Sequence, residues 1–410
     1  MINFLKKIKY KYRIPISPSF LILLIFFPIY LLLGLILRIL KINFFKLFWV
    51  NAIGHLIGEP DFYIRELFLN KKSKNKKIVL LLPIDKVANK YYLKFLKDDF
   101  IIIKSTIACK ILEPFLILPF VTINPDKYFT DINITDNIRF KKNITNFNIN
   151  TVIRKTFPKF TIELNSKEKK ENFDLIKKFK LEKFNGYVTL HFRDYRFRDI
   201  IPGPRDTKNL LSYNDLIKYL INEKKLAVIR MGRGKEIVPY PQKIEGFYDY
   251  AASSNASDKN DVLLMGNSKL FIGTNSGLAL LSYKFRVPSC YLNYVPFSKS
   301  SMAPYSYYFP KLYKDKKNNK FLTVSQIVNS DIFNSIDPKD YKNYEVIEND
   351  SNDILNFVKE FILRKDNNYI ESKENLELRA KFYKIMENKF FYGNKNISSY
   401  FLIKYKNLIQ

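Results

Sequence analysis

A short apolar run that ends in a polar or glycine-containing loop, with a helical pattern behind it, recurs through the second half of this chain. The apolar runs predict buried strands over 187–190, 226–229, 270–272 and 289–292. Helical patterns separate them over 213–223, 258–265 and 278–285. Strands that alternate with helices in this way pair in parallel, because each helix carries the chain back to the starting edge of the sheet. The second half is therefore predicted to be a parallel α/β domain.

The first half carries a weaker version of the same alternation. Its strands are predicted over 78–82, 100–103 and 121–123. A helix is expected over 87–97, and a polar helical segment over 161–180 connects the halves. We therefore predict an α/β fold with two Rossmann-like domains, over 46–182 and 183–365, and a helical tail over 366–410.

The N-terminal region predicts a membrane element. Phe20 to Leu37 are eighteen residues without a charge, just long enough for a transmembrane helix at about 1.5 Å per residue, and no small-residue cleavage site follows. The range 1–45 is therefore expected to be a membrane anchor. Basic residues flank the run on both sides, so the positive-inside rule leaves its orientation open. Pro28 favours a second form, a re-entrant helix with aromatic residues at the interface, namely Phe44, Phe45, Phe48 and Trp49.

The charge and the cysteine count narrow the partners. The 410 residues carry a formal net charge of +30, but the lysines are scattered and no helix-turn-helix, zinc-finger spacing or aromatic RNA-binding signature accompanies them. We therefore expect no nucleic acid, and favour membrane lipid and anionic sugar donors as partners. Cys109 and Cys290 form no disulfide framework, which favours a reducing compartment. The expected location is the bacterial inner membrane, with the domains on its cytoplasmic face.

Polar side chains concentrate where the predicted strands of the second half end. Arginine suits two-pronged contacts with phosphate oxygens, and a Ser-Gly helix start turns N–H groups toward an anion. The expected ligand contacts are Arg193, Arg205, Arg230, Gly232, Asp249, Asn275, Ser276 and Gly277. Because the carboxyl ends of parallel strands meet at one edge of a sheet, these residues predict one site for a substrate that carries phosphates.

Three residues of the same region are candidate catalytic bases. Asp194 and Asp206 each stand next to an arginine, which keeps a carboxylate ionised, and we favour Asp194 slightly over Asp206. His191 titrates nearer to neutral pH but could instead donate a hydrogen bond to a phosphate. The acceptor side is expected at His55 and Glu59 in the first domain. The sequence offers no Asp-x-Asp triplet at a strand end and no His/Cys cluster, so no metal is expected.

Six short motifs occur in an order that resembles a bacterial family of glycosyltransferases. They are Ile53-Gly54-His55-Leu56, His191-Phe192-Arg193-Asp194, Arg205-Asp206 with Tyr213, Arg230-Met231-Gly232, Asp249-Tyr250-Ala251, and Ser276-Gly277-Leu278 with Pro288 and Asn293. One departure is Arg286, where that family usually has a glycine. The resemblance covers roughly residues 51–295 and implies a GT-B-like pair of Rossmann-like domains, the second of which binds a nucleotide sugar.

The resemblance implies a membrane-associated, metal-independent glycosyltransferase. Such an enzyme transfers a sugar from a nucleotide-sugar donor, a co-substrate, to a glycan or lipid-linked acceptor, and needs no further cofactor. The acceptor would be a cell-surface polysaccharide or glycolipid. Two alternatives remain open: transfer of another group, such as pyruvyl or polyol phosphate, in surface-polymer synthesis, and a non-catalytic scaffold that binds sugar nucleotides.

Overall fold

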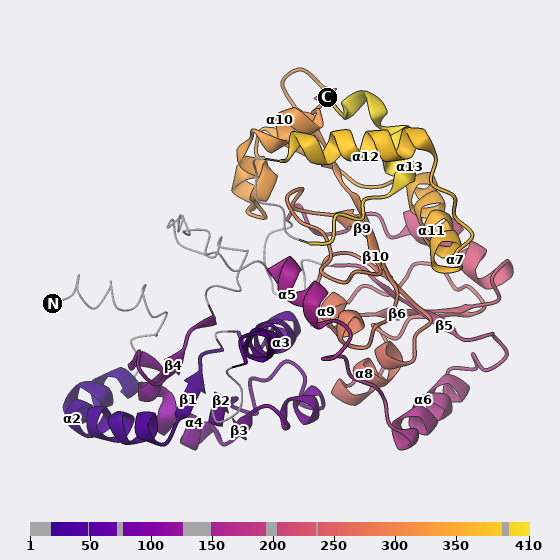
Figure 1. Cartoon of the computed structure of the whole chain (residues 1–410). Helices are drawn as coiled ribbons and strands as arrows, with labels where there is room; N and C mark the ends of the chain where they lie inside the picture. The colour runs from indigo at the N-terminus through magenta and orange to yellow at the C-terminus, as the bar shows by residue number, and fades with distance from the viewer. Residues whose placement is uncertain are drawn as a thin grey trace. The chain divides into compact units, whose positions relative to one another are not determined.

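The chain forms two compact units, each with its own parallel sheet (Figure 1). The computed structural model describes residues 18–47, 49–71, 77–125, 149–193, 203–234, 237–387 and 393–410, with only the backbone over 18–24 and at 149. The first unit holds the described residues up to Thr156, and the second begins at Phe157. The helix at 166–178 thus belongs to the second unit, whereas the sequence suggested a boundary between 182 and 183.

The first unit is built on a four-stranded parallel sheet in the order β3-β2-β1-β4. Its strands are β1 (Ile42–Phe45), β2 (Lys77–Leu81), β3 (Ile101–Ile103) and β4 (Thr122–Ile123). Its helices are α2 (Pro18–Ile39), α3 (Ile53–Leu69), α4 (Thr106–Leu112) and α5 (Ile149–Thr156), with the 3-10 helices η1 (Tyr92–Leu96) and η2 (Glu113–Ile117). The range expected to be an anchor, 1–45, therefore ends inside this sheet.

The strand β1 was not predicted, and it corrects the expectation for two aromatic residues. Phe44 and Phe45 are 2% and 1% exposed, because β1 lies between β2 and β4 and turns both rings into the unit's interior. Phe44 stacks on Phe115 with ring centroids 5.2 Å apart. These two residues are core residues and do not lie at a lipid interface.

Two local differences from the predicted elements have plain physical causes. The helix expected over 87–97 is only the short η1, because the side chain of Asn89 accepts a hydrogen bond from the Tyr92 N–H at 2.8 Å and competes with helical pairing. The helix α3 was missed, since Gly54, Gly58 and Pro60 weaken its helical pattern.

The second unit contains a six-stranded parallel sheet in the order β10-β9-β8-β5-β6-β7. Its strands are β5 (Tyr187–His191), β6 (Ala227–Met231), β7 (Phe247–Tyr248), β8 (Leu270–Gly273), β9 (Ser289–Tyr294) and β10 (Ser306–Pro310). A small antiparallel sheet joins β11 (Leu312–Asp315), β12 (Lys320–Phe321) and β13 (Tyr344–Ile347). The predicted parallel α/β architecture of this half is confirmed.

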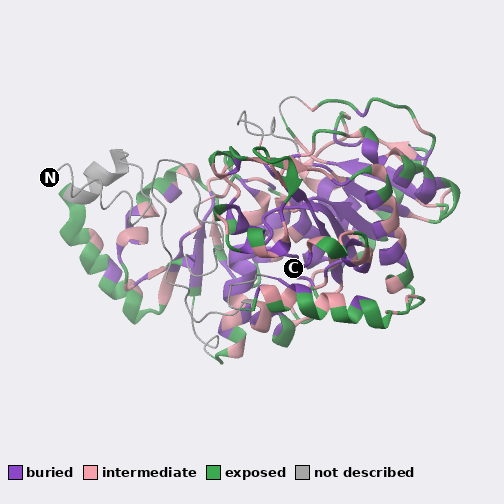
Figure 2. Ribbon diagram, turned by 90° about the horizontal axis from the view of Figure 1, so that it is seen from above, coloured by how far each residue is buried: buried purple, intermediate pink, exposed green. Residues whose placement is uncertain are grey.

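Helices cover the six-stranded sheet, and its central strands are buried along their length (Figure 2). The helices are α6 (Ser166–Lys178), α7 (Asn214–Asn222), α8 (Asp258–Gly266), α9 (Gly277–Lys284), α10 (Val324–Val328), α11 (Ser351–Lys365), α12 (Lys373–Ile385) and α13 (Ser399–Lys404), with the 3-10 helices η5 (Leu211–Tyr213), η6 (Asp331–Asn334), η7 (Pro338–Tyr341) and η8 (Lys406–Leu408). The C-terminal helices belong to this unit, since Ser398 Oγ donates to Glu360 Oε2 on α11 at 2.6 Å.

The apolar N-terminal run forms the helix α2. Tyr30 and Leu37 pack on the core cluster of the first unit, and Gly34 lies so close to Leu118 that an added Cβ would come within 2.6 Å of its Cδ1. Among the residues that the structure describes, no helix combines the length and the apolar character needed to cross a membrane.

Candidate functional site

The strand ends of the second unit's sheet meet as the sequence predicts. His191, the last residue of β5, is in register with Gly273 at the end of β8 and with Met231 at the end of β6. The residues that follow these three strands therefore emerge side by side at the carboxyl edge. Thr274, directly after β8, accepts a hydrogen bond from the Arg193 N–H at 3.1 Å and joins two of the loops.

Arg205, Asn275 and Ser276 form a polar cluster at the start of α9, which we call the α9 corner. The Nη2 atom of Arg205 donates to the Asn275 carbonyl at 2.7 Å. Within the described part of the chain, the buried atoms Arg205 Nε, Asn275 Oδ1 and Ser276 Oγ have no hydrogen-bond partner, and no carboxylate forms an ion pair with Arg205. Buried polar atoms are normally paired, so this concentration of unpaired atoms is typical of a ligand site.

The start of α9 adds backbone donors to this cluster. Ser276 is the N-cap residue, yet its hydroxyl makes no capping bond, and the first turn contains no acidic residue. The N-terminal N–H groups of a helix carry partial positive charge and favour an anion. Burial lowers the pKa of Arg205, and Tyr294 and Asp206 oppose that shift without removing it. A phosphate group would supply the negative charge that this corner lacks.

Arg193 and Asp206 are tied to each other. The Nε of Arg193 is 3.1 Å from Asp206 Oδ1, and the second carboxylate oxygen of Asp206 accepts from the Gly203 N–H at 2.7 Å. Because both oxygens of Asp206 are engaged, it is poorly suited to receive a proton from a substrate. Its geometry instead favours a role in orienting Arg193, whose side chain is 34% exposed.

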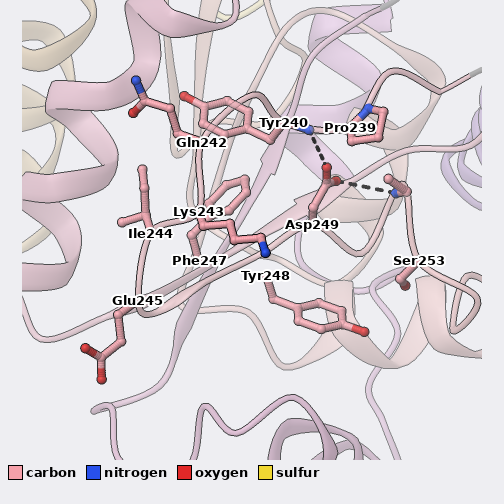
Figure 3. A pocket seen from close by; sticks show the side chains of 11 residues that line it. Pro239, Tyr240, Gln242, Lys243, Ile244, Glu245, Phe247, Tyr248, Asp249 and Ser253 are labelled. Carbon is pink, nitrogen blue, oxygen red and sulfur yellow. Dashed lines mark hydrogen bonds between the residues drawn. The ribbon is translucent and has the colours of Figure 1, made fainter.

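The buried Arg230, near the end of β6, forms a second pair with the half-buried Asp249, which follows β7. Arg230 is 4% exposed, and its Nη1 contacts Asp249 Oδ2 at 3.0 Å and the Val238 carbonyl at 2.9 Å. Asp249 also accepts from the backbone N–H of Tyr240 at 2.7 Å (Figure 3). This arginine is matched by its own carboxylate, so the contacts favour a structural role more than phosphate binding.

A pocket of about 580 Å³ opens beside Asp249. Figure 3 shows its wall of aromatic and polar side chains, which include Tyr240, Phe247 and Tyr248. No residue of the α9 corner lines it. We therefore place the candidate site by its unpaired polar atoms and treat this pocket as a separate feature.

His191 and Gly232 lie close to each other at the ends of β5 and β6. Burial lowers the pKa of His191 to about 4, its hydrogen bond with the Met231 carbonyl opposes this, and Arg193 and Arg230 add to the lowering. At 3.1 Å from a carbonyl oxygen, Nδ1 must carry the proton. The imidazole is thus neutral at physiological pH and is a weak base. Gly232 has φ +149°, a conformation that favours glycine, and an added Cβ would lie 3.6 Å from the ring.

Three other predicted residues remain: Asp194, and His55 with Glu59 in the first unit. Asp194, the favoured base, falls outside the described residues. In the first unit, His55 Nδ1 lies 2.5 Å from Glu59 Oε1, one turn further along α3, and the ring of Trp49 lies 4.6 Å from the imidazole. Burial raises the pKa of Glu59, and His55 opposes that shift. A carboxylate in this position accepts from Nδ1–H and fixes the imidazole tautomer.

Two polar residues at the site, Lys311 and Tyr294, and one buried lysine further along the chain, Lys299, were not predicted. Lys311 is 2% exposed and its Nζ donates to the Asp206 carbonyl at 2.7 Å. Lys299 follows β9, and burial lowers its pKa to about 7. Tyr294 ends β9 and interacts electrostatically with Arg205. The rule that placed the other residues at strand ends, applied to β9, would have found Tyr294. No local signal marks Lys299 or Lys311.

Arg286, the one departure from the motif pattern, has φ +57° and lies in the left-handed region. That conformation is one that glycine adopts at less cost than arginine. The departure therefore affects the turn after α9 and leaves the α9 corner unchanged.

Comparisons with known proteins give weak similarities. No protein-family model and no curated protein matches the chain. Among solved structures, the chain is similar to the iron-containing dodecameric glycosyltransferase TibC of enterotoxigenic E. coli, with 13% identity and a TM-score of 0.36 over 65% of this chain and 61% of that one. It is also similar to the E. coli ADP-heptose lipopolysaccharide heptosyltransferase II, with 13% identity and a TM-score of 0.35 over 62% and 84% of the two chains. The matched region thus spans less than two thirds of the length of TibC.

Proposed function

We propose that this chain is a glycosyltransferase whose second unit binds the diphosphate of a nucleotide-sugar donor at the α9 corner. The observation that carries the proposal is the unmatched guanidinium of Arg205 beside the start of α9. Two more unpaired polar atoms, on Asn275 and Ser276, stand at the same place. This combination of cation, hydroxyl and helix N–H groups suits the oxygens of a phosphate.

The proposed chemistry places most of the catalytic effect on the leaving group. When the bond between the sugar and the diphosphate breaks, the departing oxygen gains negative charge. A fixed guanidinium and helix N–H groups that meet this charge stabilise the transition state more than the ground state. Arg193, held by Asp206, is a second cation at the same sheet edge. No metal is needed for this role, so transfer is expected to survive treatment with EDTA.

The acceptor side of the proposed function rests on His55 and Glu59. Glu59 orients the imidazole, which is suited to take a proton from an acceptor hydroxyl. Replacing His55 with Ala is expected to lower kcat while the affinity for the donor nucleotide stays unchanged. Asp194, the base that the sequence favours, stays a candidate for the same role.

The finer parts of the function are proposals as well. They are the GT-B-like arrangement, the motif family, a surface polysaccharide or glycolipid acceptor, and a location at the cytoplasmic face of the bacterial inner membrane. The first two rest on the motif order, which includes Arg205-Asp206 and Ser276-Gly277-Leu278.

A nucleotide panel tests the proposal. The purified chain is screened with UDP, GDP, CMP and dTDP for a rise in its melting temperature. Nucleotide sugars that contain the stabilising nucleotide are then added, and release of the free nucleotide is measured. We expect one nucleotide to stabilise the protein, and Arg205→Ala to remove that stabilisation.

The outcomes separate the competing functions. Sugar-dependent release of nucleotide supports glycosyl transfer. Binding of a nucleotide without release over long incubation supports a non-catalytic scaffold. Equal stabilisation of the chain and of its Arg205→Ala variant would show that the donor phosphates lie elsewhere.

A further inference from the structure

The helix α2 is apolar on every side, but only a narrow stripe of it meets the protein. Tyr30, Gly34 and Leu37 recur at the spacing of one helix face and pack on the core of the first unit. Tyr30 stands edge-on to Phe115, with centroids 5.2 Å apart. These three residues hold α2 against the first unit.

Outside this stripe, the described side chains of α2, from Ile25 onward, are exposed (Figure 2). All of them except Arg38 are apolar. Ile25 is 73% exposed, Leu32 61% and Ile39 79%. The remaining exposed large apolar residues of this segment are Phe26, Phe27, Ile29, Leu31, Leu33, Leu35, Ile36 and Leu40. Soluble monomers rarely expose so continuous an apolar surface, and such a surface marks an interaction site.

The neighbouring helix α4 extends this surface. Ile107 is 73% exposed and Ile111 57%, and they stand one helical turn apart. The hydroxyl of Tyr30 donates to the Ile111 carbonyl at 2.9 Å, which joins α2 to α4. We call the exposed apolar residues of 25–40 together with Ile107 and Ile111 the α2–α4 surface.

Positive charges accompany this surface. Arg38 lies in the last turn of α2, Lys41 follows the helix, and the Lys77 N–H bonds to the Lys41 carbonyl at 3.1 Å. Lys110 stands between Ile107 and Ile111 on α4. All four basic residues are exposed, and the described residues of α2 include no acidic one. Apolar side chains that enter the acyl region, with basic side chains beside them at headgroup level, suit an anionic bilayer.

We propose that the α2–α4 surface embeds in one leaflet of an anionic lipid bilayer and holds the protein to the membrane without α2 leaving its place on the first unit. This inference does not depend on glycosyl transfer. It assigns α2 a partner, the lipid surface, and adds α4 to the membrane contact, which the sequence pattern did not indicate.

A second copy of the chain is the competing occupant. Two copies would each bring a net charge of +30, and the basic residues beside α2 would have to approach a like-charged neighbour. An anionic bilayer instead meets these residues with the opposite charge. The charge balance therefore favours lipid.

Vesicle flotation of the full chain tests the proposal. The chain is mixed with vesicles of phosphatidylcholine containing about 30% phosphatidylglycerol, a lipid that supplies the anionic surface. The test variant carries Leu32→Ser, Ile36→Ser and Ile107→Ser. Each buried CH₂ group contributes about fourfold to partitioning, so the triple change is expected to lower vesicle binding by at least about a hundredfold.

A matched control uses exposed apolar residues of the second unit. Ile370 and Leu376 are 90% and 55% exposed, and Ile370→Ser with Leu376→Ser is expected to leave vesicle binding unchanged. A charge variant, Arg38→Gln with Lys41→Gln and Lys77→Gln, is expected to weaken binding to the anionic vesicles and to leave binding to pure phosphatidylcholine nearly unchanged.

Three results would overturn the proposal. The triple variant could float with vesicles as well as the original chain, or the control could lose binding equally. Light scattering in the absence of lipid could show a dimer that the triple variant converts to a monomer, which would assign the surface to self-association. The melting temperature checks that the variants fold, and Ile107→Ser alone, outside α2, repeats the test if the triple variant does not.

Discussion

Two corners of the same sheet edge treat their positive charge in opposite ways. The first corner is formed by the residues after β6 and β7 and by the start of α8. There Arg230 is paired with Asp249, and Arg233 forms two ion pairs, Nη1 with Asp258 at 2.5 Å and Nε with Asp261 at 2.8 Å. At the α9 corner, Arg205 has a backbone carbonyl as its partner and no carboxylate among the described residues. The protein neutralises one corner itself and leaves the other for a ligand.

The two helix starts repeat this difference. Ser257 caps α8 by accepting from the Asn260 N–H at 3.1 Å, and acidic residues stand in the first turn. Ser276 occupies the same position on α9 but makes no side-chain cap, and its first turn has no acid. The same residue type at the same N-cap position therefore supports folding in one corner and remains available for binding in the other.

The largest expected effect is on stability, at the matched arginine. Arg230→Ala leaves the half-buried Asp249 without its cation, and loss of the buried partner of such a pair costs about 3 kcal/mol. The melting temperature should fall by on the order of 10 °C. Arg205→Ala serves as the control and should change it far less. Equal losses in the two variants would abolish the distinction between the corners.

Turnover should depend more on Arg205 than on Arg230, the reverse of the order expected for stability. Arg205→Ala removes a charge-assisted contact to the leaving diphosphate, worth about 3 kcal/mol in the transition state, so kcat should fall on the order of a hundredfold. Arg205→Lys should restore only part of the lost kcat, because an ammonium group lacks the planar two-pronged contact of a guanidinium. Single-turnover rates on folded protein measure this. Near-normal turnover in Arg205→Ala would reject the α9 corner as the donor site.

The pH dependence of folding probes His191, which lies between the two corners. Its pKa is about 4 in the folded chain and about 6.5 when unfolded, so between these values the unfolded chain binds more protons. Its contribution is therefore complete above pH 6.5 and is lost as the pH falls toward 4, by roughly 2–3 kcal/mol. The free energy of unfolding of His191→Gln, measured from pH 7 to 4, should lack this loss.

The difference between the unfolding free energies of the original chain and of His191→Gln isolates the contribution of His191, because the other titrating groups contribute to both pH curves. Among them is Asp261, whose pKa burial raises to about 7 while Arg233 opposes the shift. Parallel curves for the original chain and His191→Gln would mean that His191 is not buried in its neutral form.

The smallest effects should separate the two serines. Ser257→Ala removes a helix cap and should cost about 1 kcal/mol of stability with no change in nucleotide affinity. Ser276→Ala removes no cap, so the melting temperature should stay constant while the Kd for the nucleotide rises severalfold. Calorimetric titration and thermal melts of both variants make the comparison. If Ser276→Ala lost stability and kept its affinity, the hydroxyl would have a structural role.

The sequence predicted the framework of the second unit well. The strands ending at His191, Met231 and Gly273 were expected within one or two residues, because parallel strands buried on both faces form unbroken apolar runs. The first unit was harder. Its strand β1 has four residues and stands directly after the apolar helix, so no boundary separated the two, and α3 carries glycine and proline in its interior.

Within the site, the sequence determined which residues reach the sheet edge, since strand ends follow from local apolar patterns. It could not determine which of those residues are satisfied by the protein itself. The contact between Arg205 and Asn275 spans 70 positions and that between Arg230 and Asp249 spans 19. Such pairings depend on how loops pack in space, and only the tertiary structure decided that Arg230 has a carboxylate and that Arg205 does not. The same holds for α2. Its apolar character follows directly from its sequence. Which residues pack on the protein and which stay exposed is decided only when β1, α4 and η2 fold against it.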